Sequence, residues 1–117
     1  MQKTQLTNQT MRSYNNLMFG KKQKINYKYN EGELIKEFSQ YIDSTYNKHY
    51  SLNKYQSTEF IIDSGHGEGF CIGNIMKYAQ RYGKKDGKNR ADILKVLHYA
   101  LFMLHVHDKM EKTSDEN

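Results

Sequence analysis

The sequence has 117 residues, which favours a single domain, and its formal net charge of +5 favours anionic partners. Its hydrophobic content of 37% and mean hydropathy of −0.95 are low for a chain that buries a core alone, so we expect a homo-oligomer, either a dimer or a tetramer. A single cysteine, Cys71, excludes an internal disulfide framework and favours the cytoplasm, and no apolar run reaches the ~18–20 residues of a membrane span.

Residues 1–30 are rich in Asn, Gln, Thr and Lys and show little helical periodicity. Within them Ile25, Tyr27 and Tyr29 alternate with polar neighbours, which is the pattern of a half-buried edge strand, and Gly20 could turn the chain before it. The sequence therefore predicts an N-terminal arm or β-hairpin here, with a disordered tail as the alternative.

Residues 31–108 are predicted to form a domain of about four helices, so the expected fold class is mainly α. The first helix covers residues 31–47, with Asn30 as its N-cap and apolar side chains at helical spacing. A short second helix begins at a Ser57 cap, continues through the segment TEFIID and ends at Gly65.

The third helix is predicted to begin between Gly67 and Gly69, to run to about Tyr82 and to end at Gly83. The last helix follows a cap at Asn89 and covers 90–107, and residues 109–117 are expected to be a frayed polar tail. Because the last helix is apolar almost all round, it should be buried on more than one side, partly by another subunit.

Residues 63–89, DSGHGEGFCIGNIMKYAQRYGKKDGKN, place glycines before the third helix and cations along it and after it. Bare amide groups at a helix N-terminus attract anions, and Lys77 and Arg81 share one stripe with Asn74. We therefore predict a phosphate-binding site, with His66 and Tyr78 available to stack on a base. The predicted ligand-binding residues are His66, Gly67, Gly69, Asn74, Lys77, Tyr78, Arg81, Lys84, Lys85 and Arg90. The alternative is a tight glycine turn followed by solvated lysines.

No catalytic residue, metal site or resident cofactor is predicted. The glycine run matches neither the phosphate loop nor the dinucleotide fingerprint, and Cys71 lacks a second cysteine. His105 and His107 point in different directions on a helix, and His98 is expected to lie in the core or an interface. Asp63 and Asp92 could hold Mg²⁺ for a kinase; helix capping, or an ion pair with Arg81 or Arg90, is the alternative.

The segments QSTEFIID, GFCIGNIMKYAQRYGKK and NRADILKVLHY, with the motif G-N-x-x-K-Y-x-x-R-x-G-x-K at their centre, resemble a phage-encoded family of small all-helical domains. This family, a domain of unknown function, includes the small nucleotide kinase of T-seven-like podoviruses. The resemblance covers about residues 49–104. It implies a phage accessory protein in the host cytoplasm that handles nucleotides, with six predicted residues on the family's motif: Asn74, Lys77, Tyr78, Arg81, Lys84 and Lys85.

Three functions stay open from the sequence. We favour sequestration of a nucleotide, such as a cyclic dinucleotide immune signal, without turnover, because the central run offers phosphate ligands and no evident base or nucleophile. In size, charge and expected assembly the chain is similar to phage anti-CBASS sponge proteins, which serve immune evasion. The alternative is a Mg²⁺-dependent nucleoside monophosphate kinase, since kinases of the family work without a standard phosphate loop. The third function, binding of nucleic acid, has less support from the sequence, because the cations are spread from Lys3 to Lys112.

Overall fold

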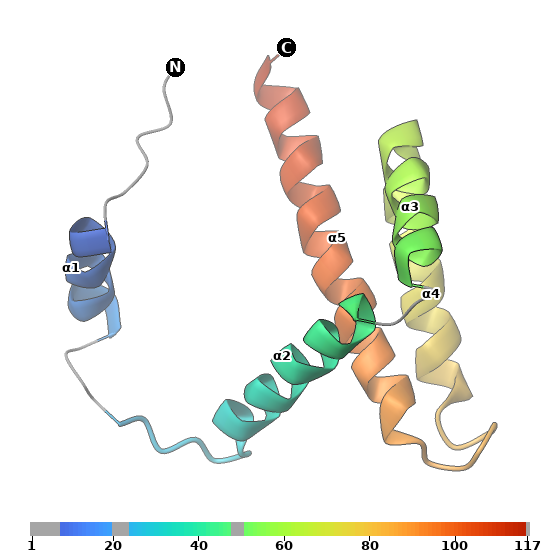
Figure 1. Cartoon of the computed structure of the whole chain (residues 1–117), viewed down its shortest axis with the longest axis horizontal. Helices are drawn as coiled ribbons and strands as arrows, with labels where there is room; N and C mark the ends of the chain where they lie inside the picture. Colours follow the sequence, from blue (N-terminus) through green and yellow to red (C-terminus); the bar gives the residue numbers. More distant parts are fainter. Residues whose placement is uncertain (1–7, 20–23, 48–50, 117) are drawn as a thin grey trace. The chain divides into compact units, whose positions relative to one another are not determined.

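The structure, a computed structural model, describes residues 8–19, 24–47 and 51–116, and these residues are mainly helical, as the sequence predicts (Figure 1). The chain divides into two compact units, Met1–Gly32 and Glu33–Asn117. Within the described ranges, no helix has both the length and the apolar content that a membrane crossing requires.

The first unit contains a helix, α1 (Asn8–Phe19), so the prediction of an arm or hairpin without helix was wrong there. Glutamine, methionine, arginine and leucine in this segment favour a helix by intrinsic propensity, although their periodicity is weak. The strand predicted around Ile25–Tyr29 is also absent from residues 24–30. The ring of Tyr27 instead lies against the backbone of Gly32, where a Cβ would be 3.3 Å from the ring. The expected turn at Gly20 falls outside the described residues.

Helix α2 (Glu31–Tyr46) has the predicted extent. Asn30 adopts a left-handed conformation with φ of 61°, which differs from the extended backbone of a usual N-cap. The backbone N–H of Tyr29 instead donates to the carboxylate of Glu31 at 2.7 Å, and this contact fixes the entry into the helix.

Helix α3 (Ser51–Ile61) begins earlier than predicted, and Ser57 lies in its interior rather than at its cap. Tertiary contacts account for the difference. Tyr55, in the first part of α3, stacks on Tyr46 of α2 with ring centroids 4.3 Å apart, and its hydroxyl is 2.5 Å from that of Thr45. These contacts hold the early turns of α3 in place, although the local sequence has little helical periodicity.

A π-helical segment (Ile62–His66) joins α3 directly to α4 (Gly67–Arg81). The predicted break at Gly65 is confirmed, because this residue has φ of 88°, a conformation that glycine adopts without strain. The predicted bounds of the third helix are also confirmed. Gly83 ends the turn after α4 with φ of 87°.

Helix α5 (Arg90–Glu116) starts at the predicted cap, where the N–H of Ala91 donates to Asn89 Oδ1 at 2.9 Å. It extends well past residue 107, so the predicted frayed tail was wrong for residues 109–116. Two exposed contacts form along the extra turns: Lys109 Nζ is 2.9 Å from Asp63 Oδ1, and His107 lies 4.0 Å from Glu111 one turn later. Good helix formers such as Lys, Met and Glu fill the segment.

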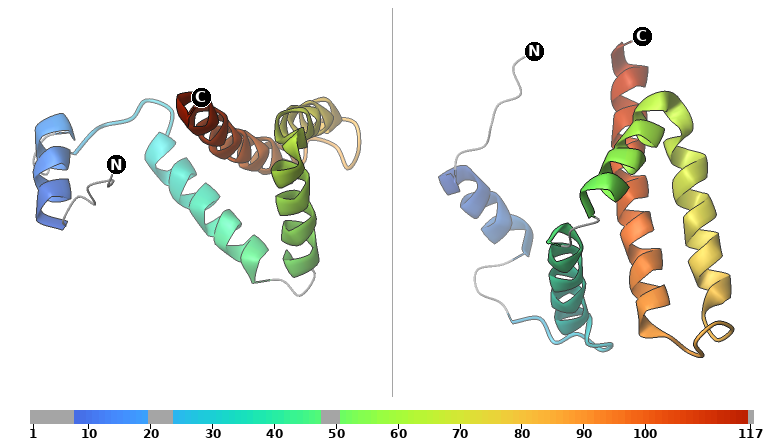
Figure 2. Two further views of the ribbon diagram at one scale, coloured as in Figure 1. Left: turned by 90° about the horizontal axis from the view of Figure 1, so that it is seen from above. Right: turned by 45° about the vertical axis from the view of Figure 1, so that its right-hand side comes forward.

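The core of the second unit lies between α4 and α5, which run side by side in opposite directions (Figures 1 and 2). Among the described residues, only Cys71, Tyr99 and Val106 are buried apolar side chains. A second contact region surrounds the buried ring of His98 on α5, which Phe38 and Tyr41 of α2 approach edge-on at 6.3 and 5.8 Å. This small core positions the residues of the candidate site.

Candidate functional site

Three cationic side chains from two helices converge on the ring of Tyr78. The Nζ of Lys95 on α5 lies 4.9 Å from the ring centroid, and the Nζ of Lys77 and the Cζ of Arg81 on α4 lie 5.2 and 5.8 Å from it. An aromatic face attracts cations, so the ring gathers them in one place. We call Lys77, Tyr78, Arg81 and Lys95 the Tyr78 cluster.

The position of Arg81 is set by Asp92 at the start of α5. Arg81 Nε is 3.6 Å from Asp92 Oδ1, and the side chains of Arg81 and Asp92 are 23% and 2% exposed. A carboxylate so deeply buried requires a cation beside it, since desolvation of an unpaired charge is costly. The pair therefore joins α4 to α5 and fixes the guanidinium at the cluster.

Tyr99 forms a rigid support beneath Tyr78. The two rings are nearly parallel, at 12°, with centroids 5.9 Å apart, and Phe70 meets Tyr99 edge-on at 5.8 Å. Burial, with smaller contributions from neighbouring groups such as Tyr78, raises the pKa of Tyr99 to about 12. Its hydroxyl therefore stays protonated at physiological pH, and Tyr99 adds no charge to the cluster.

Of the predicted site residues, Lys77, Tyr78 and Arg81 are brought together, whereas Asn74, Lys84 and Arg90 have other partners. Asn74 Nδ2 donates to the carbonyl of Phe70 at 2.9 Å. Lys84 Nζ is 3.3 Å from Gln80 Oε1. Arg90 forms a two-pronged ion pair with Glu37 of α2, which raises the pKa of Arg90 and lowers that of Glu37. Lys85 is exposed after α4, and its contribution to binding stays a prediction.

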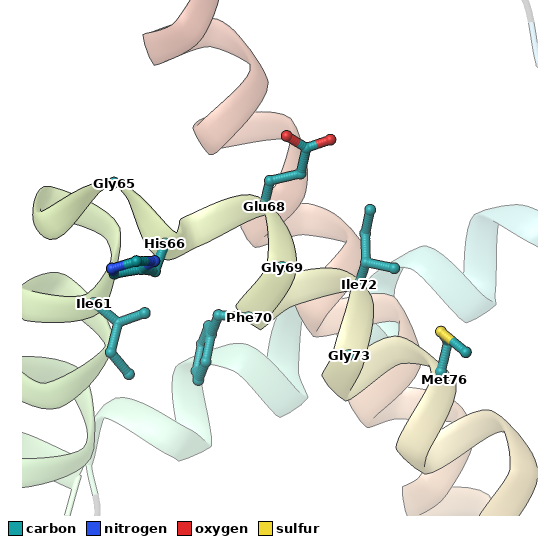
Figure 3. A pocket seen from close by; sticks show the side chains of 9 residues that line it. All are labelled: Ile61, Gly65, His66, Glu68, Gly69, Phe70, Ile72, Gly73 and Met76. Carbon is teal, nitrogen blue, oxygen red and sulfur yellow. The ribbon is translucent and has the colours of Figure 1, made fainter.

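A surface hollow of about 830 Å³ lies along the first half of α4 (Figure 3). His66 and Gly69 from the predicted site line it, together with Ile61, Phe70, Gly73 and Met76 among others. No residue of the Tyr78 cluster lines the hollow, although Met76, its last lining residue, directly precedes Lys77 in the sequence. Its lining contains one carboxylate, Glu68, and no lysine or arginine.

Gly67 serves packing between helices. It is buried, and a Cβ at this position would lie only 2.9 Å from a methyl group of Val106 on α5. The segment before it is a short turn with a kink at Gly65, where two helices meet, rather than an open glycine loop. Anion binding at the front of α4 stays a prediction, and the structure places the convergence of cations farther along the helix.

The two carboxylates considered for Mg²⁺ are both paired with cations. Asp92 pairs with Arg81, as the ion-pair alternative expects, whereas Asp63 pairs with Lys109 rather than with either arginine. In residues 8–19, 24–47 and 51–116, no three His, Cys, Asp or Glu side chains are grouped as metal ligands. Cys71 is buried, and burial raises the pKa of its thiol.

Sequence analysis missed Lys95 and the support from Tyr99. Lys95 is the one charged residue between Asp92 and Asp108 of α5, inside the otherwise apolar run ILKVLHYALF. An isolated cation in such a run has to reach either solvent or an aromatic partner, and this signal could have identified it. Its partner Tyr78 is 17 positions away, however, so spacing alone does not reveal the pair.

Residues 44–101 match the DUF3310 family, which is described as a protein of unknown function. The match spans α3, α4 and the first half of α5, and it contains every residue of the Tyr78 cluster together with Asp92 and Tyr99. No curated protein and no solved structure matches the chain. The family description gives no activity, so the function has to be argued from the geometry.

Proposed function

We propose that this protein binds a nucleotide through its phosphate groups at the Tyr78 cluster and releases it chemically unchanged. The observation that carries the proposal is the convergence of Lys77, Arg81 and Lys95 around one half-buried ring. An anion with several oxygens can contact more than one of these cations at once, and arginine and lysine supply the two usual modes of phosphate binding, a planar fork and a point charge.

The hollow along α4 offers room for the uncharged part of a nucleotide. Phe70, Lys77 and Arg81 recur at helical spacing, so they follow one side of α4 from the hollow to the cluster. A volume of about 830 Å³ is within the ordinary range for small-molecule sites. A base placed against His66 or Phe70 would gain roughly 1–3 kcal/mol from stacking, by analogy with single-stranded nucleic-acid sites.

Binding is favoured over turnover by the state of the nearest carboxylates. A kinase needs a free carboxylate to hold Mg²⁺ or to accept a proton. Asp92 is buried against Arg81, and Asp63 is paired with Lys109. We therefore favour sequestration of a nucleotide, for example a cyclic dinucleotide of the kind used as a bacterial immune signal. The alternative is nucleoside monophosphate kinase activity, and the experiment has to distinguish it from binding without turnover.

The test is calorimetric titration of the full chain with a cyclic dinucleotide and with a nucleoside monophosphate, followed by heat denaturation and chromatography of the released ligand. Recovery of intact ligand is the expected result. Formation of a diphosphate from monophosphate, ATP and Mg²⁺ would favour the kinase. If no nucleotide binds, and a single-stranded oligonucleotide binds with a steep salt dependence, the protein binds nucleic acid instead.

Lys95→Gln is the best single substitution for this test, with Lys36→Gln on the exposed surface of α2 as its control. Both remove one positive charge from a helix. Because hydrogen bonds to charged groups are worth about 1.5–3 kcal/mol, Lys95→Gln should weaken nucleotide binding about tenfold or more, and Lys36→Gln should not. Equal losses in both variants would show that net charge, rather than the cluster, attracts the ligand. Arg81→Ala is a poorer probe, because it also leaves Asp92 buried without its cation.

A further inference from the structure

Helix α5 has one apolar face that no other described part of the second unit covers. Ile93, Leu97 and Leu104 are 46%, 45% and 62% exposed, and Ala100 between them is also exposed. We call these four residues the α5 stripe. Tyr99 and Val106 point to α4, and His98 meets α2, so the stripe occupies a third side of the helix. Leu101, although exposed, belongs to a hollow shared with α3.

The spacing of the stripe is that of a helix that packs along another helix. Its residues follow one another at intervals of four, three and four positions, which is the a and d spacing of a heptad seam. Leucine and isoleucine on such a seam lose little entropy on packing and gain most of their burial from a partner helix. With three buried apolar side chains in the described residues, the unit has little other core to rely on.

The sizes of the side chains select one arrangement of two such helices. In a parallel pair, Leu97 would meet Leu97 of the partner and Ala100 would meet Ala100, which leaves one crowded layer beside one empty layer. In an antiparallel pair centred between these positions, each Leu97 lies opposite an Ala100, and each Ile93 lies opposite a Leu104. Alternation of large and small residues across a seam fills the space evenly.

Charge at the edge of the seam selects the same arrangement. Arg90 and Asp108 fall on the same flank of α5, beside the stripe, near its two ends. The antiparallel register brings Asp108 of one chain near the Arg90–Glu37 ion pair of the other, whereas a parallel pair would bring Asp108 beside Asp108. Opposite charges at such flanking positions set helix orientation. Because the stripe is self-complementary in both size and charge, its occupant is a second copy of this chain.

We propose that two copies of this protein associate through an antiparallel contact between their α5 stripes, with Leu97 of each copy packed against Ala100 of the other. The contact uses a few residues per helix and is smaller than the ~800 Å² per partner of a standard interface. Association should therefore depend on concentration, with a dissociation constant on the order of 1–100 µM. The proposal does not depend on the nucleotide site, which lies on the side of α5 that faces α4.

The test is sedimentation of the full chain over a range of concentrations, for the wild type and for Leu97→Glu. The wild type should approach a dimer, and Leu97→Glu should remain a monomer with unchanged helical content by circular dichroism. The matched control is Met76→Glu, which replaces a 65% exposed apolar side chain on α4 with the same charge. A wild type that stays monomeric up to about 100 µM would overturn the proposal. So would dissociation by Met76→Glu but not by Leu97→Glu.

A size exchange tests the register itself and does not depend on a charged substitution. Leucine is nearly as good a helix former as alanine and Ala100 is exposed, so the isolated chain should tolerate Ala100→Leu. In the dimer it places Leu against Leu97 of the partner twice, and it should weaken association about tenfold or more. The double variant Leu97→Ala, Ala100→Leu again places a large side chain opposite a small one, and it should recover most of the lost dimer affinity. If the double variant associates as weakly as Ala100→Leu, the antiparallel register is wrong.

Discussion

Arg81 on α4 and Asp92 at the start of α5 form a buried contact that joins the two helices, with Arg81 Nε 3.6 Å from Asp92 Oδ1. The second oxygen of Asp92 has no hydrogen-bond partner in the described part of the chain, and neither does Arg81 Nε. The guanidinium is therefore the main compensation for the buried charge of Asp92. This relationship makes Asp92 a positioning residue for the cluster as well as a structural one.

Asp92→Asn should lower the free energy of unfolding by about 1–3 kcal/mol, because Arg81 loses its charged partner in a place that water hardly reaches. Urea denaturation at neutral pH measures the change. Asp63→Asn is the control, since it removes an exposed carboxylate that also pairs with a cation, Lys109. An exposed pair contributes little, and we expect a change within about 0.5 kcal/mol. Equal effects of the two substitutions would mean that burial does not increase the contribution of the Asp92 ion pair to the free energy of unfolding.

Only part of the Tyr78 cluster could be predicted from the sequence. Lys77 and Arg81 follow from helical spacing, and both were predicted. Lys95 reaches the same place from a second helix and was not predicted, because its partner is set by the packing of α4 on α5 rather than by distance along the chain. The pairing of Asp92 with Arg81 was one of the alternatives that the sequence left open. The same packing gives Gly67 a role that a glycine-rich loop could not indicate, which is contact with Val106.

Lys95→Gln should affect binding more than folding. In the free protein it removes a cation–π contact with Tyr78, so the free energy of unfolding should fall by no more than about 1 kcal/mol. With a nucleotide present, the variant should gain less thermal stability than the wild type, because ligand stabilisation scales with affinity. Thermal unfolding with and without ligand checks both. A variant that is destabilised when free but gains as much stability from the ligand as the wild type would show that Lys95 serves packing at Tyr78 and not ligand binding.

His98 should make the fold sensitive to mild acid. Burial, followed by the nearby charge of Lys54, lowers the pKa of His98 below its ordinary value of 6.5. Between 6.5 and that lower pKa the unfolded chain binds a proton that the folded chain does not, so stability is complete above pH 6.5 and falls as the pH drops below it. Urea denaturation from pH 8 down to about pH 5 should show the decline.

His98→Phe tests the assignment, because phenylalanine keeps a ring between Phe38, Tyr41 and Phe102 and removes the titrating nitrogen atoms. The variant should lose most of the decline in stability below pH 6.5. His105→Gln, at an exposed position on α5, should retain it. If the free energy of unfolding of His98→Phe falls as steeply below pH 6.5 as that of the wild type, another group controls the acid sensitivity.

The helices that sequence predicted well are those with clear local signals at both ends. Helix α4 lies between Gly65 and Gly83, both at positive φ, and α5 begins at the Asn89 cap. The errors fall where the sequence has no clear signal for the end of a helix. The first turns of α3 pack on Tyr46 of α2, and the last turns of α5 continue past the predicted end through good helix formers.

Gly67 and Gly69 were both predicted to bind phosphate. The structure predicts that alanine substitutions at these two positions have opposite effects on stability. At Gly67 a Cβ would lie 2.9 Å from Val106, so Gly67→Ala should push α4 away from α5 and lower the free energy of unfolding by about 1–3 kcal/mol. At Gly69 nothing lies within 4 Å of the added carbon, and alanine favours a helix over glycine by about 1 kcal/mol, so Gly69→Ala should stabilise the fold. Urea denaturation of both variants gives the comparison. A stabilised Gly69→Ala that still binds nucleotide would place the ligand at the Tyr78 cluster alone, whereas loss of binding with intact stability would show that the ligand reaches the front of α4.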